Sequence, residues 1–377
     1  MAAAPRLERD ALTRLAYIAL GLWGFLLYAL GPALPELRRE FDVSRTVVSF
    51  HTTLVALGAV AVGLFGARVV ARLGRRRAFW TAIAGAAAGA ALLALGPALT
   101  VTLPGAALMG FSGGLLVALI QAILADRHGR LSAAALSEAN ALATLMGAVA
   151  PFSIALAILA GSDWRAPVLA VALVGLPLLG IVHRSVHFPP GAVPAARGAA
   201  RLPRTYWRLW TGLVLFVSAE FCIALWSVDY LETEVGLRRS AATGFASLFL
   251  LGMAAGRAAG GRLARRTSSR RLLAGSLALA GAGFGAFWLS PWPAAAVAGL
   301  AVTGLGIALL YPLTVALAID AVPGRSVTAS ARIALGSGVA IALAPFILAA
   351  LADTAGLFRA YAIVPTLLAG GWLAGRR

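Results

Sequence analysis

Residues 46–98 read TVVSFHTTLVALGAVAVGLFGARVVARLGRRRAFWTAIAGAAAGAALLALGPA, and this stretch indicates how the rest of the chain is built. Two apolar runs, 46–67 and 78–98, flank a short segment that holds five arginines. A bilayer core about 30 Å thick needs about 20 apolar residues in a helix. We therefore predict two transmembrane helices joined by a positively charged turn.

The same alternation of apolar runs and short polar gaps continues along all 377 residues. Hydrophobic residues make up 60% of the chain and charged residues only 12%, with a mean hydropathy of +0.88. A soluble domain carries about 25% charged residues, so a soluble fold is excluded and an all-α integral membrane protein surrounded by lipid is predicted. The predicted spans are 12–34, 46–67, 78–98, 102–125, 134–160, 166–186, 206–231, 241–262, 271–290, 293–319, 326–352 and 357–375.

The formal net charge of +18 could suggest nucleic acid, but the distribution of the arginines argues against that partner. The chain has no lysine, and its arginines cluster between apolar runs, as the positive-inside rule predicts for membrane proteins. With the N-terminus inside the cell, 25 arginines fall in inner segments and 7 in outer ones. We therefore expect a multi-pass protein of the cell (inner) membrane with both termini in the cytoplasm. The outer arginines are Arg38, Arg39, Arg45, Arg165, Arg238, Arg239 and Arg359.

The chain also reads as a duplicated unit. When the chain is aligned with itself at a shift of about 190 residues, Gly66 matches Gly256. At a shift of 194 residues, Asp126 matches Asp320. Two parallel repeats with a binding site between them are a transporter architecture. The predicted division is a six-helix N-terminal half at 1–186, a cytoplasmic linker rich in Pro, Ala and Arg at 187–205, and a six-helix C-terminal half at 206–377.

The segment Gly66-Ala-Arg-Val-Val-Ala-Arg-Leu-Gly-Arg-Arg-Arg77 resembles the signature loop of the major facilitator superfamily, roughly G-x-L-x-D-R-x-G-R-R. The matching residues are Arg72, Gly74, Arg75 and Arg76, while Ala71 stands at the acidic position. The resemblance covers the whole chain and implies twelve transmembrane helices in two pseudo-symmetric six-helix halves. It also implies alternating access around a central site, with this loop forming part of a cytoplasmic gate.

Polar side chains inside a membrane span are candidates for function because they are costly there. Glu220 lies about 20 Å into its predicted helix, near the bilayer midplane, where it could bind a proton or a polar substrate, or be a neutral structural acid. Asp229 is nine residues further on, hence on the opposite helix face. It is a second proton or substrate candidate, or else a solvated residue at the outer mouth. His51 is a proton candidate or a hydrogen-bonded structural residue, and Gln121 and Asn140 are candidates to line the cavity.

Four charged residues, Glu138, Arg257, Asp320 and Arg332, are predicted at the inner ends of four helices. They form either a structural ion cluster at the cytoplasmic rim or a gate whose ion pairs exist in one state only. The spacing Gly252-x-x-x-Gly256-x-x-x-Gly260 predicts close helix packing.

No spacing typical of a metal, nucleotide or catalytic site is found, so no cofactor and no enzyme activity are predicted. The sequence predicts a monomeric secondary transporter of a small molecule that works by alternating access. Coupling to protons, an uncoupled facilitator, and a membrane sensor that binds a ligand without transporting it all stay open. The substrate and the direction of transport are not predicted.

Overall fold

The computed structural model describes residues 7–188, 202–263, 266–322 and 325–375, and in this part of the chain the regular structure is helical. The α-helices are α1 (Ala11–Tyr28), α2 (Leu30–Phe41), α3 (Arg45–Leu95), α4 (Leu99–His128), α5 (Ser132–Leu159), α6 (Arg165–Leu169), α7 (Leu176–Val182), α8 (Arg204–Thr233), α9 (Arg239–Leu263), α10 (Ser269–Leu289), α11 (Pro293–Ile307), α12 (Leu310–Asp320), α13 (Ser326–Ala355), α14 (Leu357–Ala360) and α15 (Ile363–Gly375). A π-helical segment, Ala170–Gly175, joins α6 to α7.

The described residues form eleven helical segments long and apolar enough to cross a membrane, and one of them, α3, contains two crossings. Gly74 breaks α3 with φ 74° and ψ 159°, a backbone conformation that favours glycine. Arg165 donates to the carbonyl of Ala94 and pairs with Glu40, which places the residues on either side of α3 at the same end of the molecule. The chain therefore reverses at Gly74, and twelve crossings result, as predicted.

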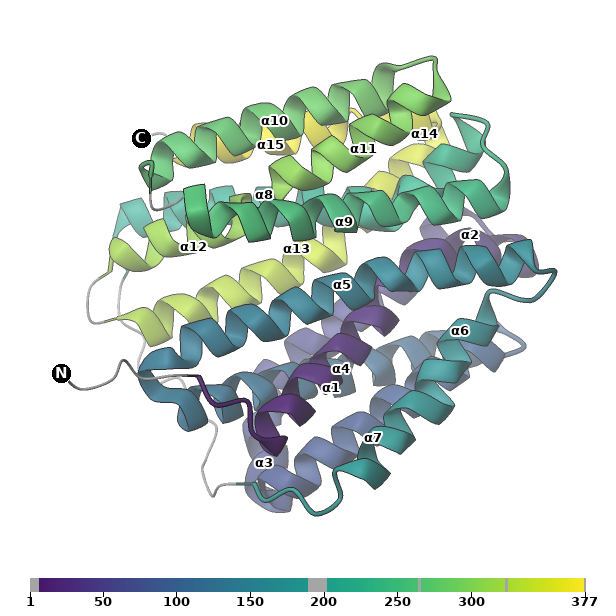
Figure 1. Cartoon of the computed structure of the whole chain (residues 1–377). Helices are drawn as coiled ribbons and strands as arrows, with labels where there is room; N and C mark the ends of the chain where they lie inside the picture. Colours follow the sequence, from purple (N-terminus) through teal and green to yellow (C-terminus); the bar gives the residue numbers. More distant parts are fainter. Residues whose placement is uncertain (1–6, 189–201, 264–265, 323–324, 376–377) are drawn as a thin grey trace.

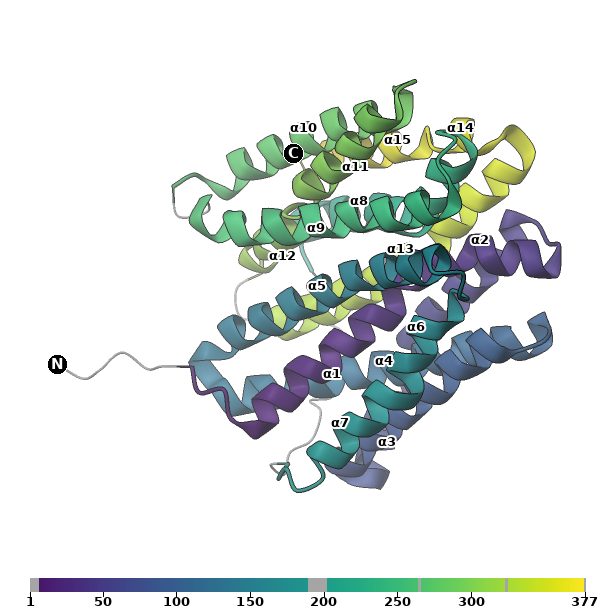
Figure 2. The same ribbon diagram turned by 45° about the vertical axis from the view of Figure 1, so that its right-hand side comes forward.

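We use N-half for residues 7–186 and C-half for residues 206–375. Figures 1 and 2 show the N-half helices in the lower part of the molecule and most of the C-half helices above them. The two sets meet where α5 packs along α9 and where α3 packs along α13. The division into two repeats stays a prediction, and residues 189–201 of the predicted linker lie outside the described residues.

Two of the interrupted crossings, the first and the tenth, have a tyrosine beside the break. The first crossing bends at Ala29, between α1 and α2, directly after Tyr28. The tenth crossing bends at Ala308 and Leu309, between α11 and α12, shortly before Tyr311. The causes are Pro32 and Pro312, because a proline cannot donate the helical hydrogen bond to the carbonyl four residues earlier. Broken helices are typical of the binding region of transporters.

The three glycines at four-residue spacing lie where α9 approaches α11 and α12. A Cβ atom added to Gly256 would lie 2.6 Å from the carbonyl oxygen of Leu305 and 2.6 Å from the Cβ of Ala308. A Cβ atom added to Gly252 would lie even closer to the neighbouring backbone, at the carbonyl oxygen of Ala301. These contacts agree with the predicted helix-packing role, since no side chain fits between the two backbones.

Gly256→Leu should therefore destabilise the fold by about 1–3 kcal/mol or more, because overpacking forces the two helices apart. The measurement is the thermal unfolding temperature of the detergent-purified variant. The matched control is Gly281→Leu on α10, where an added Cβ has no atom within 4 Å. Equal stability of the two variants would contradict the assigned packing.

Candidate functional site

Glu220 lies near the middle of α8 and is 7% exposed. The ionisable groups that interact with it electrostatically are Arg257 of α9, Tyr28 at the end of α1, and Tyr311 of α12. The carboxylate is not in direct ion-pair contact with the guanidinium of Arg257. Glu220 is therefore an acid enclosed in protein, with one cation nearby and two tyrosines supplied by the two broken crossings.

Arg257 reaches from the C-half to the N-half. Its Nη1 donates to Oγ1 of Thr144 on α5 over 2.5 Å. The Thr144 hydroxyl in turn donates to the carbonyl of Asn140 over 2.9 Å, so its oxygen is left to accept from Arg257. Arg257 is half-buried and Thr144 is buried. The guanidinium is thus held in one orientation at the contact between the halves, close to Glu220.

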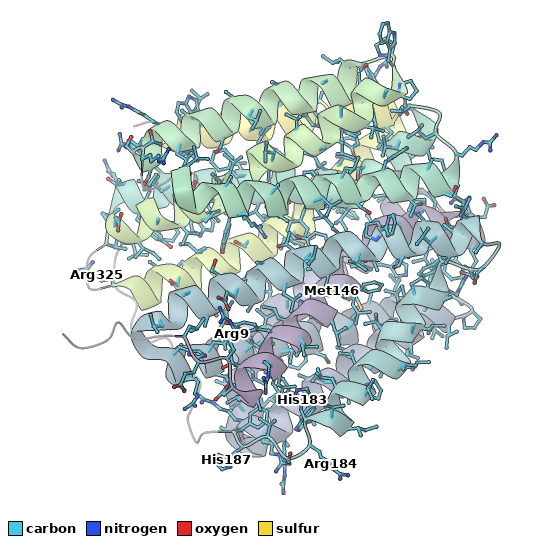
Figure 3. The ribbon with its side chains drawn as sticks, viewed as in Figure 1. Arg9, Met146, His183, Arg184, His187 and Arg325 are labelled. Carbon is cyan, nitrogen blue, oxygen red and sulfur yellow. The ribbon has the colours of Figure 1, made fainter. Side chains whose placement is uncertain are left out.

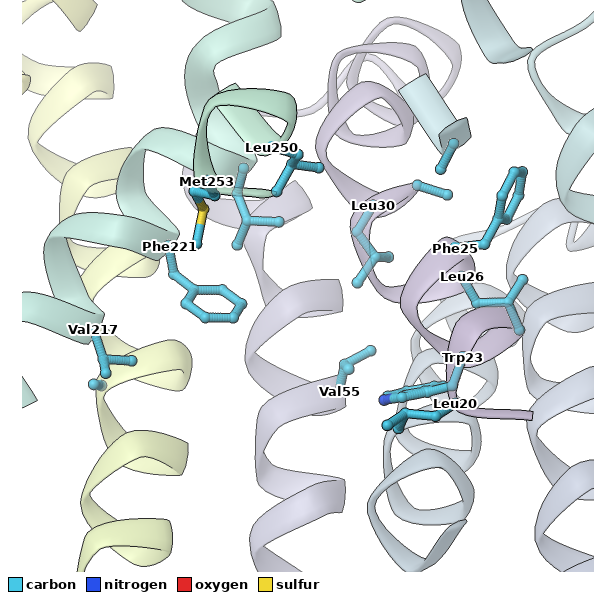
Figure 4. Close-up of a cluster of buried hydrophobic side chains, with 14 of the residues drawn as sticks. Leu20, Trp23, Phe25, Leu26, Leu30, Val55, Val217, Phe221, Leu250 and Met253 are labelled. Carbon is cyan, nitrogen blue, oxygen red and sulfur yellow. The ribbon is translucent and has the colours of Figure 1, made fainter. Parts of the chain in front are cut away.

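Aromatic and aliphatic side chains lie next to Glu220. The ring of Tyr28 stacks on Phe221, the residue after Glu220, with 6.3 Å between ring centroids. Figure 4 shows Phe221 and Met253 on the C-half side of a buried cluster and Leu30 and Val55 on the side of the N-half. A polar pair enclosed by apolar groups is the usual composition of a small-molecule site.

One end of the molecule is closed by ion pairs between the halves. Asp229, at the end of α8, is fully buried and binds two arginines of the N-half: Arg38 of α2 at 3.0 Å and Arg45 of α3 at 2.6 Å. The prediction that Asp229 is a solvated residue at the outer mouth is wrong. Its carboxylate is buried because both oxygens are neutralised by arginines from the other half.

Further contacts join the halves at the same end. Glu36 of α2 pairs with Arg39, at 2.8 Å, and with Arg239 of α9, and Arg39 also pairs with Glu232 at 2.9 Å. Asp353 of α13 accepts hydrogen bonds from the backbone N–H groups of residues 45 and 46, at 3.0 and 2.7 Å, at the start of α3. We call Glu36, Arg38, Arg39, Arg45, Asp229, Glu232, Arg239 and Asp353 the outer network.

The opposite end, where α7 and α8 meet the linker, is called the linker end. Its described charged pairs stay within the N-half: Glu138 binds Arg9 at 2.7 Å and Arg127 binds Asp10 at 2.8 Å. Figure 3 shows Arg9 at this end, with Arg184 near the end of the N-half and His187 just after it. These ion pairs of the described residues therefore do not join the two halves.

The four residues predicted to cluster at the inner rim do not come together. Glu138 pairs with Arg9, and Arg257 lies in the polar centre against Thr144. Asp320 lines a cavity of about 520 Å³ inside the C-half, together with Arg270. The backbone carbonyl of Arg332 accepts from Nε1 of Trp210. The prediction of one four-residue cluster is wrong because Glu138 and Arg257 each bind a partner outside this set.

The comparisons with known proteins agree with this architecture. The sequence profile of the Major Facilitator Superfamily matches residues 16–245 and 209–375. The chain belongs to the major facilitator superfamily. A curated relative, an uncharacterized MFS-type transporter of Salmonella typhimurium (strain LT2), is 29% identical over 181 residues. That match covers 46% of this chain and 44% of the relative, so it spans less than half of either protein.

Solved structures of the superfamily share the fold over nearly the whole chain. A bacterial homologue of the human lysosomal transporter Spinster, inward-facing and unoccupied, gives a TM-score of 0.78 at 14% identity and covers 99% of this chain and 98% of its own. The occupied inward-facing form gives 0.75 at 16% identity, with 97% and 96% covered. The fucose:proton symporter of E. coli gives 0.65 at 15% identity, with 97% of both chains covered. The chain thus has the twelve-helix fold of the superfamily.

The superfamily signature loop is held within the N-half. Arg75 is buried and pairs with Asp126 at the end of α4, at 2.6 Å. Arg76 donates to the carbonyl of Arg184. Gly74 forms the break in α3, and Arg72 is exposed. Asp126 therefore supplies an acidic partner to this loop, although the usual acidic position is Ala71.

The remaining candidates lie away from the polar centre. His51 is fully buried, with Nδ1 at 2.8 Å from the carbonyl of Val48 and Nε2 at 2.8 Å from Oγ1 of Thr102. The Nδ1 contact thus lies within α3, and the Nε2 contact joins α3 to α4. Gln121 and Asn140 are exposed, and the Asn140 amide donates to the carbonyl of Leu136. No cluster of His, Cys, Asp or Glu among the described residues could hold a metal ion.

The sequence interpretation missed most of the residues around these sites. Tyr28, Tyr311 and Thr144 are uncharged residues in apolar runs, and the only local signal was the proline near each tyrosine. The outer network was easier to detect in the sequence. Its four arginines are among the seven predicted on the outer side of the membrane, against the positive-inside rule, and an arginine on that side suggests a specific partner.

Proposed function

We propose that this protein is a proton-coupled secondary transporter of a small molecule, in a conformation closed to the outside and poised to open to the cytoplasm. The observation that carries the proposal is the position of the ion pairs between the halves. They lie at the end opposite the linker, with the buried Asp229 at their centre. The arginine count supports a cytoplasmic linker end, with both termini there, in the cell membrane.

Alternating access requires contacts that form in one state and break in the other. The outer network fits this requirement because its partners come from different halves, whereas the charged pairs at the linker end stay within one half. Both Spinster-homologue structures that share this fold are inward-facing, which supports the same interpretation.

Glu220 is the group that favours proton coupling over an uncoupled facilitator. An ionised carboxylate enclosed in protein without a direct partner costs several kcal/mol, so it is stable only when protonated or when a cation moves close. Glu220 lies near one cation, Arg257, which is itself anchored on the other half. Movement of the halves would therefore change the charge state that Glu220 favours.

The test of this function uses purified protein in liposomes loaded with a pH-sensitive dye. Addition of a transported solute should move protons together with the solute. Solute flux without proton movement would favour the facilitator, and binding without any flux would favour the membrane sensor. Either result would reject proton-coupled transport.

The orientation can be tested with two single cysteines, after Cys222 is replaced by serine. Arg77→Cys lies in the signature loop, and Glu234→Cys lies after α8 at the opposite end; both positions are exposed. In intact cells an impermeant thiol reagent should label position 234 and leave position 77 unlabelled. Inverted vesicles should give the reverse pattern. Labelling of position 77 from outside would overturn the proposed orientation.

A further inference from the structure

We propose that the transported solute is a small organic monocarboxylate with an apolar body, and that its carboxylate binds Arg257 while Glu220 takes up the proton. This inference rests on the proposed transport function and names the substrate class of the same site. It is carried by three features of the polar centre: the orientation of Arg257, its charge balance with Glu220, and the aromatic and aliphatic side chains around both.

The orientation of Arg257 suits a carboxylate. A guanidinium presents five N–H donors in a flat fork that binds a carboxylate through two parallel hydrogen bonds. Arg257 donates one hydrogen bond, from its terminal nitrogen Nη1, to the hydroxyl oxygen of Thr144. Because the Thr144 hydroxyl is itself fixed on the Asn140 carbonyl, the guanidinium is pre-oriented, with donors left for an anion.

The charge balance selects a single negative charge. When Glu220 is ionised, its charge and that of Arg257 cancel in the empty protein, and the other ionisable groups interacting with Glu220 are the phenols of Tyr28 and Tyr311. The charged groups that α2 brings to α8 are Arg38, which binds Asp229, and Arg39, which binds Glu232, and all four belong to the outer network.

A monocarboxylate on Arg257 with a proton on Glu220 leaves the centre neutral again. A cation would leave a net positive charge, and a dianion a net negative one, each at a large cost inside a membrane protein. The same arithmetic predicts electroneutral transport, with one proton moving with one anion. A pH gradient should drive accumulation, whereas a membrane potential alone should not.

The side chains around Glu220 and Arg257 suit the apolar part of such a solute. The stacked rings of Tyr28 and Phe221 lie beside Glu220, and Leu30, Val55 and Met253 belong to the adjoining cluster in Figure 4. Aromatic faces and a flexible methionine accept planar and short aliphatic groups of different shapes. A sugar would bury several hydroxyl groups here without enough partners, which is unfavourable.

The experiment measures ligand binding to the purified full-length protein by thermal stabilisation. The probes are benzoate, hexanoate and lactate, with benzamide, benzylamine and fucose as comparisons. We expect at least one carboxylate to bind about tenfold or more tightly than its uncharged counterpart, as a bidentate charged contact requires. Binding of the carboxylate should strengthen as the pH falls, because a proton on Glu220 removes a negative charge that repels the carboxylate bound to Arg257.

Two variants make the test specific. Arg257→Lys keeps the charge but removes the planar fork, so carboxylate binding should weaken about tenfold or more. Arg270→Lys, at the cavity inside the C-half, is the control and should bind as the wild type does. Glu220→Gln mimics the protonated acid, and its carboxylate binding should be tight and independent of pH.

The outcomes separate this inference from the proposed function. Proton-coupled uptake of fucose or benzylamine, with no response to any of the three carboxylates, would overturn the substrate class and leave the transport mechanism intact. Carboxylate binding that is the same in Arg257→Lys and in the wild type would also overturn it. If a carboxylate binds but no solute crosses the liposome membrane, the proposed function fails instead.

Discussion

Asp229→Asn should open the end of the transporter that is closed in this structure. The substitution keeps the size of the side chain but removes its charge, so Arg38 and Arg45 lose the carboxylate that both of them bind. Asp229 is fully buried, and breaking a buried ion pair by removing one partner costs roughly 3–5 kcal/mol. That cost falls on the outward-closed state, in which the two halves meet at this end.

The measurement is the labelling rate of a cysteine placed between the halves. Thr53→Cys suits this purpose because the Thr53 hydroxyl donates across the interface to the carbonyl of Ala342, about two turns of α3 from Arg45. An impermeant reagent outside intact cells should label this cysteine about tenfold faster or more when Asp229 is Asn. The contacts of Glu36 and Asp353 between the halves remain in this variant. The labelling rate should therefore rise by less than the full free-energy cost of the broken ion pair would give.

Asp163→Asn is the matched control. Asp163 pairs with Arg165 at the same end of the protein, but both residues belong to the N-half and Asp163 is exposed. Loss of this pair should leave the labelling rate of Thr53→Cys unchanged. If Asp229→Asn also leaves the rate unchanged, the outer network does not control access.

The fold was predictable from the sequence because the bilayer constrains it strongly. A helix that satisfies its own backbone hydrogen bonds and about 20 apolar residues define each crossing. The turn at Gly74 was visible too, since five arginines interrupt two apolar runs there. The assignment of Glu220 to a buried position near the middle of its helix also agrees with the structure.

Partners of charged residues were not predictable in the same way. Arg257 was expected at the inner rim, but it faces Thr144 on a helix from the other half. Asp229 was expected in solvent, but two arginines nearly two hundred residues earlier in the chain neutralise it. Such contacts depend on the rotation of each helix and on how the halves meet, and neither is encoded in the hydropathy of a single span.

The gate and the polar centre are connected through α8. Asp229 fixes the outer end of this helix to the N-half, and Glu220 lies nine residues earlier, beside Tyr28 and Arg257. When the outer network breaks, α8 must move relative to α1 and α5. The surroundings of Glu220 then change because Tyr28 and Thr144 belong to the N-half, whereas Arg257 moves with the C-half.

Glu220→Gln should therefore abolish accumulation driven by a pH gradient while exchange of solute across the membrane continues. Glutamine keeps the shape and hydrogen-bonding capacity of the protonated acid, but it can neither bind nor release a proton. In liposomes with a pH difference of one unit, the wild type should concentrate its solute up to about tenfold for one proton per solute. The variant should only equalise the concentrations on the two sides.

Glu234→Gln is the matched control for this prediction. It removes a carboxylate from the exposed end of the same helical segment, outside the polar centre, and should accumulate solute as the wild type does. Exchange by Glu220→Gln is the decisive second readout, because a misfolded variant would lose exchange as well as accumulation. If Glu220→Gln still concentrates solute under a pH gradient, Glu220 does not carry the coupled proton, and the charge balance between Glu220 and Arg257 has only a structural role.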